Sequence, residues 1–370
     1  MNDSKTNFGV LLPTREAVIS GRSDPSVLFQ LAERAEGFGF HSVCVGDSLT
    51  ARPRIDALTT LAGVGARTHR VRLGTAIFLA ALRHPILLAY QLGSLDWMTG
   101  GRIDLGVGYG RPKEPTQEHE FEILGLAPGA RMKMSEELVH VMRRLWREKD
   151  VSYAGAFTNF EHVTLEPKPV QPGGVPIWLA SNNVEPGLKR VGRLGDGWLN
   201  NIKSPAVYRE CWEKIRGHAT DAGRDPNSIH PAIYFTLAAG GKEAVVEGQT
   251  FLAQYYNRSY EAVANAMLCV TGSWDEVIDW MEKYVQAGAR TVVLRFAARD
   301  QLAYLDACAE ALARRDCLSN PSPFLKKDFI PDSAVAIDRK RETESLHSKV
   351  DGFLPLSKHR STVLGGILRS

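Results

Sequence analysis

The feature that most constrains the fold of this chain is a regular alternation of short strand-like runs with longer helical patterns. Each strand-like run is rich in apolar and β-branched residues and is bounded by Gly, Pro or polar residues. The eight runs begin near Asn7, His41, Val71, Arg102, Val175, Asp196, His230 and Arg290. Helices between consecutive strands make those strands parallel, and eight such units favour a closed (β/α)8 TIM barrel over an open doubly wound sheet.

The helix signals between the first strands support this alternation. Over residues 25–38, Asp24 is the predicted N-cap, Pro25 takes the first helical position, and apolar residues recur on one face. Gly37 and Gly39 are expected to end this helix. Two similar helices are predicted over residues 56–67 and 85–98.

Two intervals between predicted strands are much longer than the usual spacing of about 30 residues. The first, from Arg102 to Val175, contains a predicted helix over 129–149, a predicted hairpin over 151–165 and a proline-rich connector. The second follows the seventh strand, between His230 and Arg290. Loops after the strand ends form the active-site face of such barrels, so we expect insertions after strands four and seven to roof a pocket there.

The charge distribution separates a body from a tail. The 370 residues carry a formal charge of +3, and residues 318–370 contain nine Lys or Arg against six Asp or Glu. The predicted barrel domain, 1–317, is therefore near neutral and offers no surface typical of nucleic-acid binding. The polar, basic tail, 318–370, is predicted to be disordered, and a contact of its last residues with a membrane or partner is the alternative.

Composition also limits the location and the metal chemistry. No apolar run is long enough to span a bilayer, and the N-terminus lacks a basic segment followed by an apolar one, so we expect a cytoplasmic protein. Five scattered cysteines lack the paired spacing of a zinc site. We expect free thiols and no bound metal.

The run GGRIDLGVGYG, residues 100–110, indicates a buried strand that enters a glycine loop. Glycine permits positive φ angles and a close approach to the backbone, which a planar cofactor or a phosphate can use. An ordinary tight turn is the alternative, since a glycine triplet alone is weak evidence. Gly108, Tyr109 and Gly110 are the candidate binding residues of this loop.

Small and polar residues follow the other predicted strands. The candidates for ligand binding are Asp47, Thr75, Ala76, Ala180, Ser181, Asn182 and Asn183. Hydroxyl, amide and backbone N–H groups at the start of a helix suit a phosphate, so the segment 181–183 is a candidate phosphate site. Helix capping is the alternative for that segment and also for Asp47, whose carboxylate is otherwise suited to a ligand hydroxyl.

Few residues are candidates for proton transfer. Tyr109 and Glu114 flank the glycine loop. His119 lies in the first insertion, where the two alternatives are that it faces a substrate and that it is simply exposed. His84 precedes a proline at a predicted helix start, which favours a structural role. Nucleophile elbows, zinc signatures, P-loops and paired-cysteine redox motifs are absent from the sequence.

Four segments together resemble the bacterial luciferase-like flavin-dependent oxidoreductases. The segments are VGDS (45–48), residues 70–110, EPKPVQPGGVPIWLAS (166–181) and RVGRLGDGWLN (190–200). The resemblance covers about residues 7–315 and implies a (β/α)8 barrel that binds FMN or the deazaflavin coenzyme F420 at its C-terminal face. It places cofactor contacts at 108–110 and 180–183, and a non-prolyl cis peptide near Ala76 and Ile77.

One departure from the family pattern bears on the chemistry. Many members have a histidine after the acidic residue at the end of strand two, where this chain has Ser48, which is therefore a catalytic candidate. The tryptophan that some deazaflavin sugar dehydrogenases carry nearby is also absent, with Arg52 in that region. These departures favour FMN over F420.

The resemblance implies a luciferase-like monooxygenase that uses reduced FMN, supplied by a separate flavin reductase, and oxygen on a small organic substrate. It also implies a homo-oligomer, with a dimer expected. The alternatives are F420-dependent hydride transfer and a non-catalytic flavin-binding barrel. A phosphate-binding lyase or isomerase is a third alternative, but it lacks an obvious catalytic lysine at a strand end.

Overall fold

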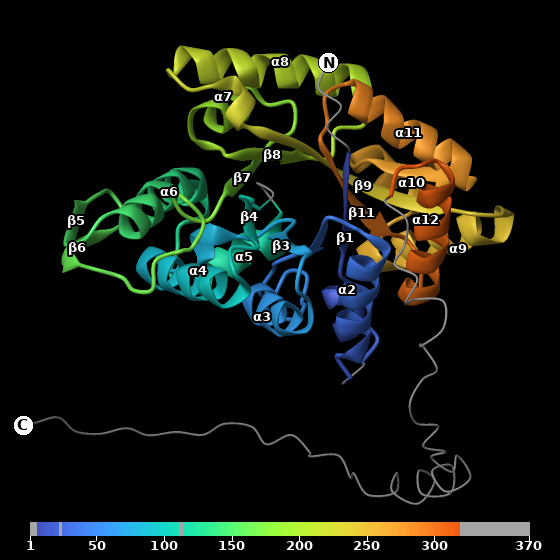
Figure 1. The fold of residues 1–370 in the computed structure, drawn as a ribbon, viewed down its shortest axis with the longest axis horizontal. Coiled ribbons are helices and arrows are strands. Elements are labelled where there is room, and N and C mark those ends of the chain that lie inside the picture. The colour runs from blue at the N-terminus through green and yellow to red at the C-terminus, as the bar shows by residue number, and fades with distance from the viewer. Residues whose placement is uncertain (1–5, 22–23, 111–113, 319–370) are drawn as a thin grey trace, which may run out of the picture. The chain divides into compact units, whose positions relative to one another are not determined.

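A computed structural model of the chain describes residues 6–21, 24–110 and 114–318. All of these residues belong to one compact unit (Figure 1). The tail predicted from residue 318 onward lies outside the described residues, apart from Leu318 itself. The boundary between the domain 1–317 and the tail therefore stays a prediction.

The described chain forms a closed barrel of eight parallel strands. The strands are β1 (Asn7–Leu11), β2 (Ser42–Val45), β3 (Arg72–Thr75), β4 (Ile103–Val107), β7 (Ile177–Ala180), β8 (Gly197–Asn200), β9 (His230–Ala239) and β11 (Thr291–Phe296). They pair in the order β9, β11, β1, β2, β3, β4, β7, β8, and β8 pairs with β9 to close the ring. The eight predicted strands and the TIM barrel are confirmed.

One strand was missed by the sequence analysis. Strand β10 (Cys269–Gly272) pairs with the last four residues of β9, whereas β8 pairs with the first four. The two strands therefore share one edge of β9, and β10 extends the sheet beyond the rim of the barrel.

Helices surround the barrel (Figure 1). They are α1 (Thr14–Ile19), α2 (Ser26–Phe38), α3 (Ala57–Arg67), α4 (Pro85–Thr99), α5 (Pro115–Glu122), α6 (Arg131–Arg147), α7 (Glu185–Leu194), α8 (Pro205–Asp221), α9 (Lys242–Tyr256), α10 (Tyr260–Ala266), α11 (Trp274–Gln286) and α12 (Gln301–Arg314). Short 3-10 turns are η1 (Ala80–Leu82), η2 (Pro128–Ala130) and η3 (Pro226–Ser228). Helix α2 begins one residue later than predicted, although Asp24 does accept a hydrogen bond from the backbone N–H of Ser26 at 2.9 Å.

Both predicted insertions are present. The first, between β4 and β7, contains α6 and an antiparallel hairpin of β5 (Val151–Ala154) and β6 (Asn159–Val163), as the sequence predicted, and also α5, which the sequence analysis did not predict. The second, between β9 and β11, contains α9, α10, β10 and α11. These segments lie at the ends of the strands that they follow, where they can cover the mouth of the barrel.

Two apolar layers hold the barrel together. A small interior cluster fills the barrel, and a much larger cluster fills the space between the sheet and the helices. The interior cluster consists of Leu11, Cys44, Leu199, Ala232 and Val293. No disulfide bond joins any of the five cysteines, all of which lie in the described part of the chain.

Candidate functional site

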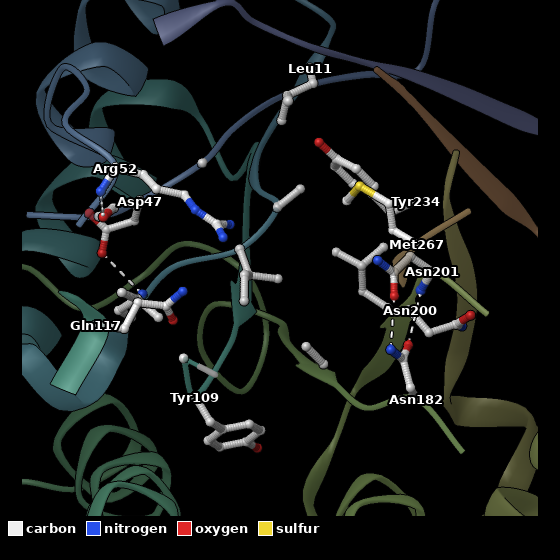
Figure 2. A pocket seen from close by; sticks show the side chains of 18 of the residues that line it. Leu11, Asp47, Arg52, Tyr109, Gln117, Asn182, Asn200, Asn201, Tyr234 and Met267 are labelled. Carbon is white, nitrogen blue, oxygen red and sulfur yellow. Dashed lines mark hydrogen bonds between the residues drawn. The ribbon is translucent and has the colours of Figure 1, made fainter. Parts of the chain in front are cut away.

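A cavity of about 440 Å³ opens at the mouth of the barrel, where the strands end (Figure 2). Strand ends and both insertions contribute to its wall. Its lining comprises Leu11, Gly46, Asp47, Ser48, Arg52, Arg54, Ala76, Ile77, Leu79, Tyr109, Gly110, Gln117, Glu120, Ala180, Ser181, Asn182, Leu199, Asn200, Asn201, Tyr234, Tyr255, Tyr256, Ala266 and Met267. The predicted roof from the two insertions is thus observed.

The structure brings most of the predicted site residues to this one cavity. The residues that line it are Asp47, Ser48, Ala76, Tyr109, Gly110, Ala180, Ser181 and Asn182. Those that do not are Thr75, Gly108, Glu114, His119 and Asn183. The functional roles of both groups stay predictions.

Asp47 fastens the end of β2 to the loop after β3. Its carboxylate accepts hydrogen bonds from the backbone N–H of Leu79 at 3.0 Å and from Arg83 Nη2 at 2.9 Å. Burial raises the pKa of Asp47, and the neighbouring Arg83 guanidinium opposes this shift. Both carboxylate oxygens therefore have partners within the protein, which gives Asp47 a positioning role in the pocket wall.

Ser48 is bound to a residue that the sequence analysis did not single out. Its Oγ donates a hydrogen bond to Glu120 Oε1 at 2.8 Å, and the same oxygen accepts from the backbone N–H groups of Thr50 and Ala51. Glu120 is fully buried, yet its Oε2 has no hydrogen-bond partner among the described residues. Because Glu120 lines the cavity, Oε2 is suited to accept a hydrogen bond from a ligand.

Helix α5 explains why Glu114 and His119 lie away from the cavity. Its buried residues are Gln117, Glu120 and Phe121, which recur at helical spacing on one face. His119 projects from another face, with its side chain 64% exposed and its Nδ1 3.6 Å from Glu122. Glu114, at the start of the helix, instead pairs with Arg258 at 3.7 Å.

The ends of β3 and β4 form an apolar part of the wall. The peptide bond between Ala76 and Ile77 is cis, which confirms the expectation from the family resemblance. A Cβ atom on Gly108 would lie 1.5 Å from Ile77 Cδ1, so glycine lets Ile77 pack directly over the end of β4. Gly108 therefore lies behind Ile77. Thr75 is buried and donates to the carbonyl of Gly106 at 2.9 Å.

The ends of β7 and β8 supply an amide-rich wall. Asn182 Nδ2 donates to Asn201 Oδ1 at 2.8 Å, and the backbone N–H of Asn201 donates back to Asn182 Oδ1 at 3.1 Å (Figure 2). Helix α7 has Val184 at its N-cap and no side-chain cap hydrogen bond. The capping alternative for the segment 181–183 therefore has no support, since Ser181 Oγ donates to the carbonyl of Asn182 instead.

Tyr109 is held as a neutral phenol near this wall. The guanidinium carbon of Arg190 lies 5.2 Å from the centre of its ring. Burial raises the pKa of Tyr109 to about 12, although Arg190 opposes the shift. The hydroxyl therefore keeps its proton at neutral pH and is suited to donate a hydrogen bond.

The cavity fits a planar organic ring with a polar tail better than a metal ion. Leu11, Ala76, Ile77 and Leu199 offer apolar surface, and Asn182 lies among polar groups at another side. Across residues 6–21, 24–110 and 114–318, no group of three His, Cys, Asp or Glu side chains is arranged to bind a metal. No helix in the same ranges has the length and apolar character of a membrane span.

Comparison with known proteins decides the family. The family model described as luciferase-like monooxygenase matches residues 6–291. The chain belongs to this family. This luciferase-like protein is also 26% identical to the monooxygenase RslO1 from Streptomyces bottropensis, whose crystal structure superimposes with a TM-score of 0.69 over 84% of this chain and 99% of RslO1.

Two curated relatives add different information about this luciferase-like chain. An uncharacterised protein of Mycobacterium tuberculosis is 34% identical over 177 residues, which is 46% of this chain and 58% of that protein. The chain thus matches less than two thirds of the length of this relative. An F420-dependent glucose-6-phosphate dehydrogenase of Kineococcus radiotolerans is 32% identical over 310 residues, 76% of this chain and 90% of the relative.

The sequence analysis missed the pocket residues that the insertions contribute. They are Gln117, Glu120, Tyr255, Tyr256, Ala266 and Met267. The sequence analysis predicted no helix over these stretches, and the face that each helix turns to the barrel depends on how it docks. A buried carboxylate or phenol in such a stretch has no distinctive local signal.

Proposed function

We propose that this luciferase-like chain is an oxidoreductase that binds a flavin-type cofactor, F420 or FMN, and acts on a small organic substrate. The observation that carries the proposal is the cavity at the barrel mouth, with its apolar surface at Ala76 and Ile77 and its amide wall at Asn182. Its volume of about 440 Å³ is within the range of small-molecule sites, roughly 300 to 1,000 Å³.

The bound cofactor would supply the redox chemistry, hydride transfer for F420 or oxygen activation for reduced FMN. The chain would supply binding and orientation. Ala76 and Ile77 would support the ring, while Asn182 Nδ2 would donate a hydrogen bond to the phosphate of the tail, and Ser181 Oγ would donate another by turning away from the carbonyl of Asn182. Glu120 Oε2 would accept a hydrogen bond from a ligand N–H or O–H, and the Tyr109 hydroxyl would donate one.

F420 is the first cofactor to test, although Ser48 and Arg52 favoured FMN at the level of sequence. The support for F420 is the dehydrogenase of Kineococcus radiotolerans, which this chain matches over 90% of its length. The support for FMN and oxygen, the second candidate, is the likeness to the monooxygenase RslO1. The second candidate additionally requires a separate reductase to supply reduced FMN, and the expected homodimer stays a prediction for both.

Fluorescence titration of the full chain with F420, FMN and reduced FMN tests the proposal. We expect a dissociation constant at or below about 100 μM for at least one of them, a range typical of useful cofactor affinity. Gly108→Ala should weaken binding about tenfold or more, because the new methyl group displaces Ile77. Gly217→Ala is the matched control, since a Cβ there meets nothing within 4 Å. Absence of binding for all three cofactors would refute the proposal.

Turnover distinguishes the enzyme from the non-catalytic flavin-binding barrel. Substrate-dependent consumption of the reduced cofactor, measured with and without oxygen, supports the enzyme and identifies which chemistry it uses. Tight cofactor binding without turnover over a broad panel of alcohols, aldehydes, sugar phosphates and aromatic compounds would favour the storage alternative.

A further inference from the structure

We propose that the cavity contains an oxyanion subsite at Arg54 and Tyr234, with the buried cation of Arg295 close behind it, so that the substrate carries a carboxylate or phosphate group. The assignment of this group to a substrate rests on the proposed oxidoreductase function. The subsite itself rests only on the burial, charge and hydrogen bonding of these residues.

Arg295 is a buried cation without hydrogen-bond partners for its terminal nitrogens. It lies on β11 with its side chain 2% exposed, and neither Nη1 nor Nη2 has a partner among the described residues. Its ion-pair contact is Glu16 Oε1, 3.7 Å from Nη2, which is beyond hydrogen-bond distance. Burying a charge is costly unless it is compensated, and besides Glu16 the rings of Phe251, Tyr255 and Tyr256 lie within about 6 Å of this guanidinium, so an anion that binds nearby would be stabilised further.

Arg54 brings a second guanidinium to the cavity wall. Its Nε donates to the carbonyl of Arg52 at 3.3 Å, which fixes the side chain after β2. A Cβ atom on Gly46 would lie 1.9 Å from Arg54 Nη1, so glycine at the end of β2 makes room for this guanidinium. No carboxylate in the described part of the chain lies within 4 Å of the Arg54 nitrogens. Its terminal nitrogens are therefore suited to bind an external anion.

Tyrosine side chains complete the subsite. Tyr234, on β9, lines the same cavity as Arg54, and Tyr255 and Tyr256 line it from α9. Burial raises the pKa of Tyr234, although the charges of Arg295 and Arg54 oppose this shift. The phenol is therefore neutral, and its hydroxyl can donate a hydrogen bond. The guanidinium carbon of Arg295 lies 4.1 Å from the ring centre of Tyr255 and 5.3 Å from that of Tyr256.

The charges around Tyr255 do not balance within the described residues. Arg15 also stacks on this ring at 4.3 Å, and its Nε and Nη1 are buried without hydrogen-bond partners. Arg54 lines the cavity, and Arg15 and Arg295 lie against the ring of Tyr255, which lines it too; among the described residues Arg295 pairs with Glu16 at 3.7 Å. A carboxylate or phosphate would compensate this excess, because guanidinium and phenol groups donate strong hydrogen bonds to either oxyanion.

The subsite is separate from the amide wall where the cofactor phosphate would bind. Figure 2 shows Asn200 and Asn201 between Asn182 and Tyr234. The two anion sites can therefore be separated by mutation.

The test is titration calorimetry of the full chain with inorganic phosphate and, separately, acetate, at constant ionic strength adjusted with chloride. We expect at least one of the two anions to bind with a millimolar dissociation constant. Arg54→Gln should raise that constant tenfold or more, and Tyr234→Phe, which removes only a hydroxyl, should raise it several-fold. Two variants are controls: Arg258→Gln, which removes one exposed arginine elsewhere, and Asn182→Ala. Each should leave the dissociation constant of the anion within twofold of the wild-type value.

Binding of phosphate alone would identify a phosphorylated substrate, and binding of acetate alone a carboxylate substrate. The proposal is overturned if neither anion binds up to about 50 mM, if the Arg54 and Tyr234 variants bind as the wild type does, or if Asn182→Ala alone abolishes binding. F420 and FMN titrations of the same samples keep the two proposals distinct. Anion binding that depends on Arg54 in a chain without cofactor affinity would refute the proposed function and leave the subsite standing.

Discussion

Two fully buried carboxylates at opposite ends of the barrel are used in different ways. Asp96, on α4, accepts hydrogen bonds on both oxygens, from the backbone N–H groups of Val170 and Gln171 and from the Gln171 side chain. Glu120, at the mouth, accepts three hydrogen bonds on Oε1 and none on Oε2. Both oxygens of Asp96 therefore accept hydrogen bonds from the protein, whereas one oxygen of Glu120 has no partner among the described residues.

The arginines of the two ends differ in the same way. Arg72, at the start of β3, donates to both oxygens of Asp104 at 2.5 and 2.6 Å and also to the side chain of Gln171. Arg295, near the end of β11, leaves both terminal nitrogens without partners. We infer that Asp96 and Arg72, at the strand starts, hold the barrel closed, whereas Glu120 and Arg295, near the mouth, keep polar atoms that have no hydrogen-bond partner among the described residues. Stability and ligand affinity should then respond to different mutations.

The largest effect is expected for Arg72→Met. This change leaves Asp104, whose side chain is 13% exposed, without its cationic partner. Breaking such a pair should lower the free energy of unfolding by about 3 kcal/mol. Urea denaturation measures the loss, and Arg67→Gln, in the more exposed pair with Glu33, is the control and should lose less than about 1 kcal/mol. Equal losses in both variants would contradict a special role for the Arg72 pair.

Acidification should also weaken the end where the strands start. Burial lowers the pKa of His230, at the start of β9, from 6.5 to about 4, and its ring stacks on Trp178. Between pH 4 and pH 6.5, His230 binds a proton in the unfolded chain but stays neutral in the folded chain. The contribution of His230 to the free energy of unfolding is therefore fully present above pH 6.5 and is lost as the pH falls toward 4. Lowering the pH from 7 to 5 should cost about 2 kcal/mol through this residue. Urea denaturation of the wild type and of His230→Asn at several pH values measures this loss. If the free energy of unfolding falls equally with pH in both proteins, His230 is not its cause.

Matched amide substitutions probe the two buried carboxylates directly. Asp96→Asn must turn an NH₂ group toward N–H donors, which should cost about 1 to 2 kcal/mol of stability. Glu120→Gln can place its NH₂ at the unpartnered Oε2 position and should cost less than about 0.5 kcal/mol. Thermal unfolding of both variants provides the comparison. A larger loss for Glu120→Gln would show that Oε2 is already satisfied within the protein.

Two serines are expected to separate cofactor affinity from stability. Ser181→Ala should weaken binding of F420 or FMN about tenfold, with the melting temperature nearly unchanged, because Ser181 caps no helix. Ser273→Ala removes the capping box of α11 and should lower stability by about 1 kcal/mol without changing cofactor affinity. The reverse pattern would make Ser181 a structural residue.

The sequence predicted the barrel well because strand periodicity and helix caps are local signals. All eight barrel strands begin within about two residues of their predicted starts. Strand β10 was missed because it is four residues long and lies inside an insertion, where only pairing with β9 defines it. The strand-end candidates, such as Asp47 and Ser181, reached the cavity because the ends of parallel strands meet at one face.

The insertions show where prediction from sequence fails. His119 and Glu120 are neighbours in α5, but one is exposed and the other is buried at the cavity. Nothing in the local pattern distinguishes them, since the docking of α5 on the barrel decides which face is buried. The same applies to Tyr255 on α9, whose contacts with Arg295 join segments that lie 40 residues apart.

A paired titration and denaturation of the wild type, Arg72→Met and Ser181→Ala tests the central claim most directly. F420 and FMN affinities are measured by fluorescence, and stabilities by urea, on the same samples. The account predicts a dissociation constant at or below about 100 μM for one cofactor in the wild type. It predicts loss of stability with retained affinity in Arg72→Met, and loss of affinity with retained stability in Ser181→Ala. Wild-type protein that binds neither cofactor, or variants in which affinity and stability fall together, would contradict it.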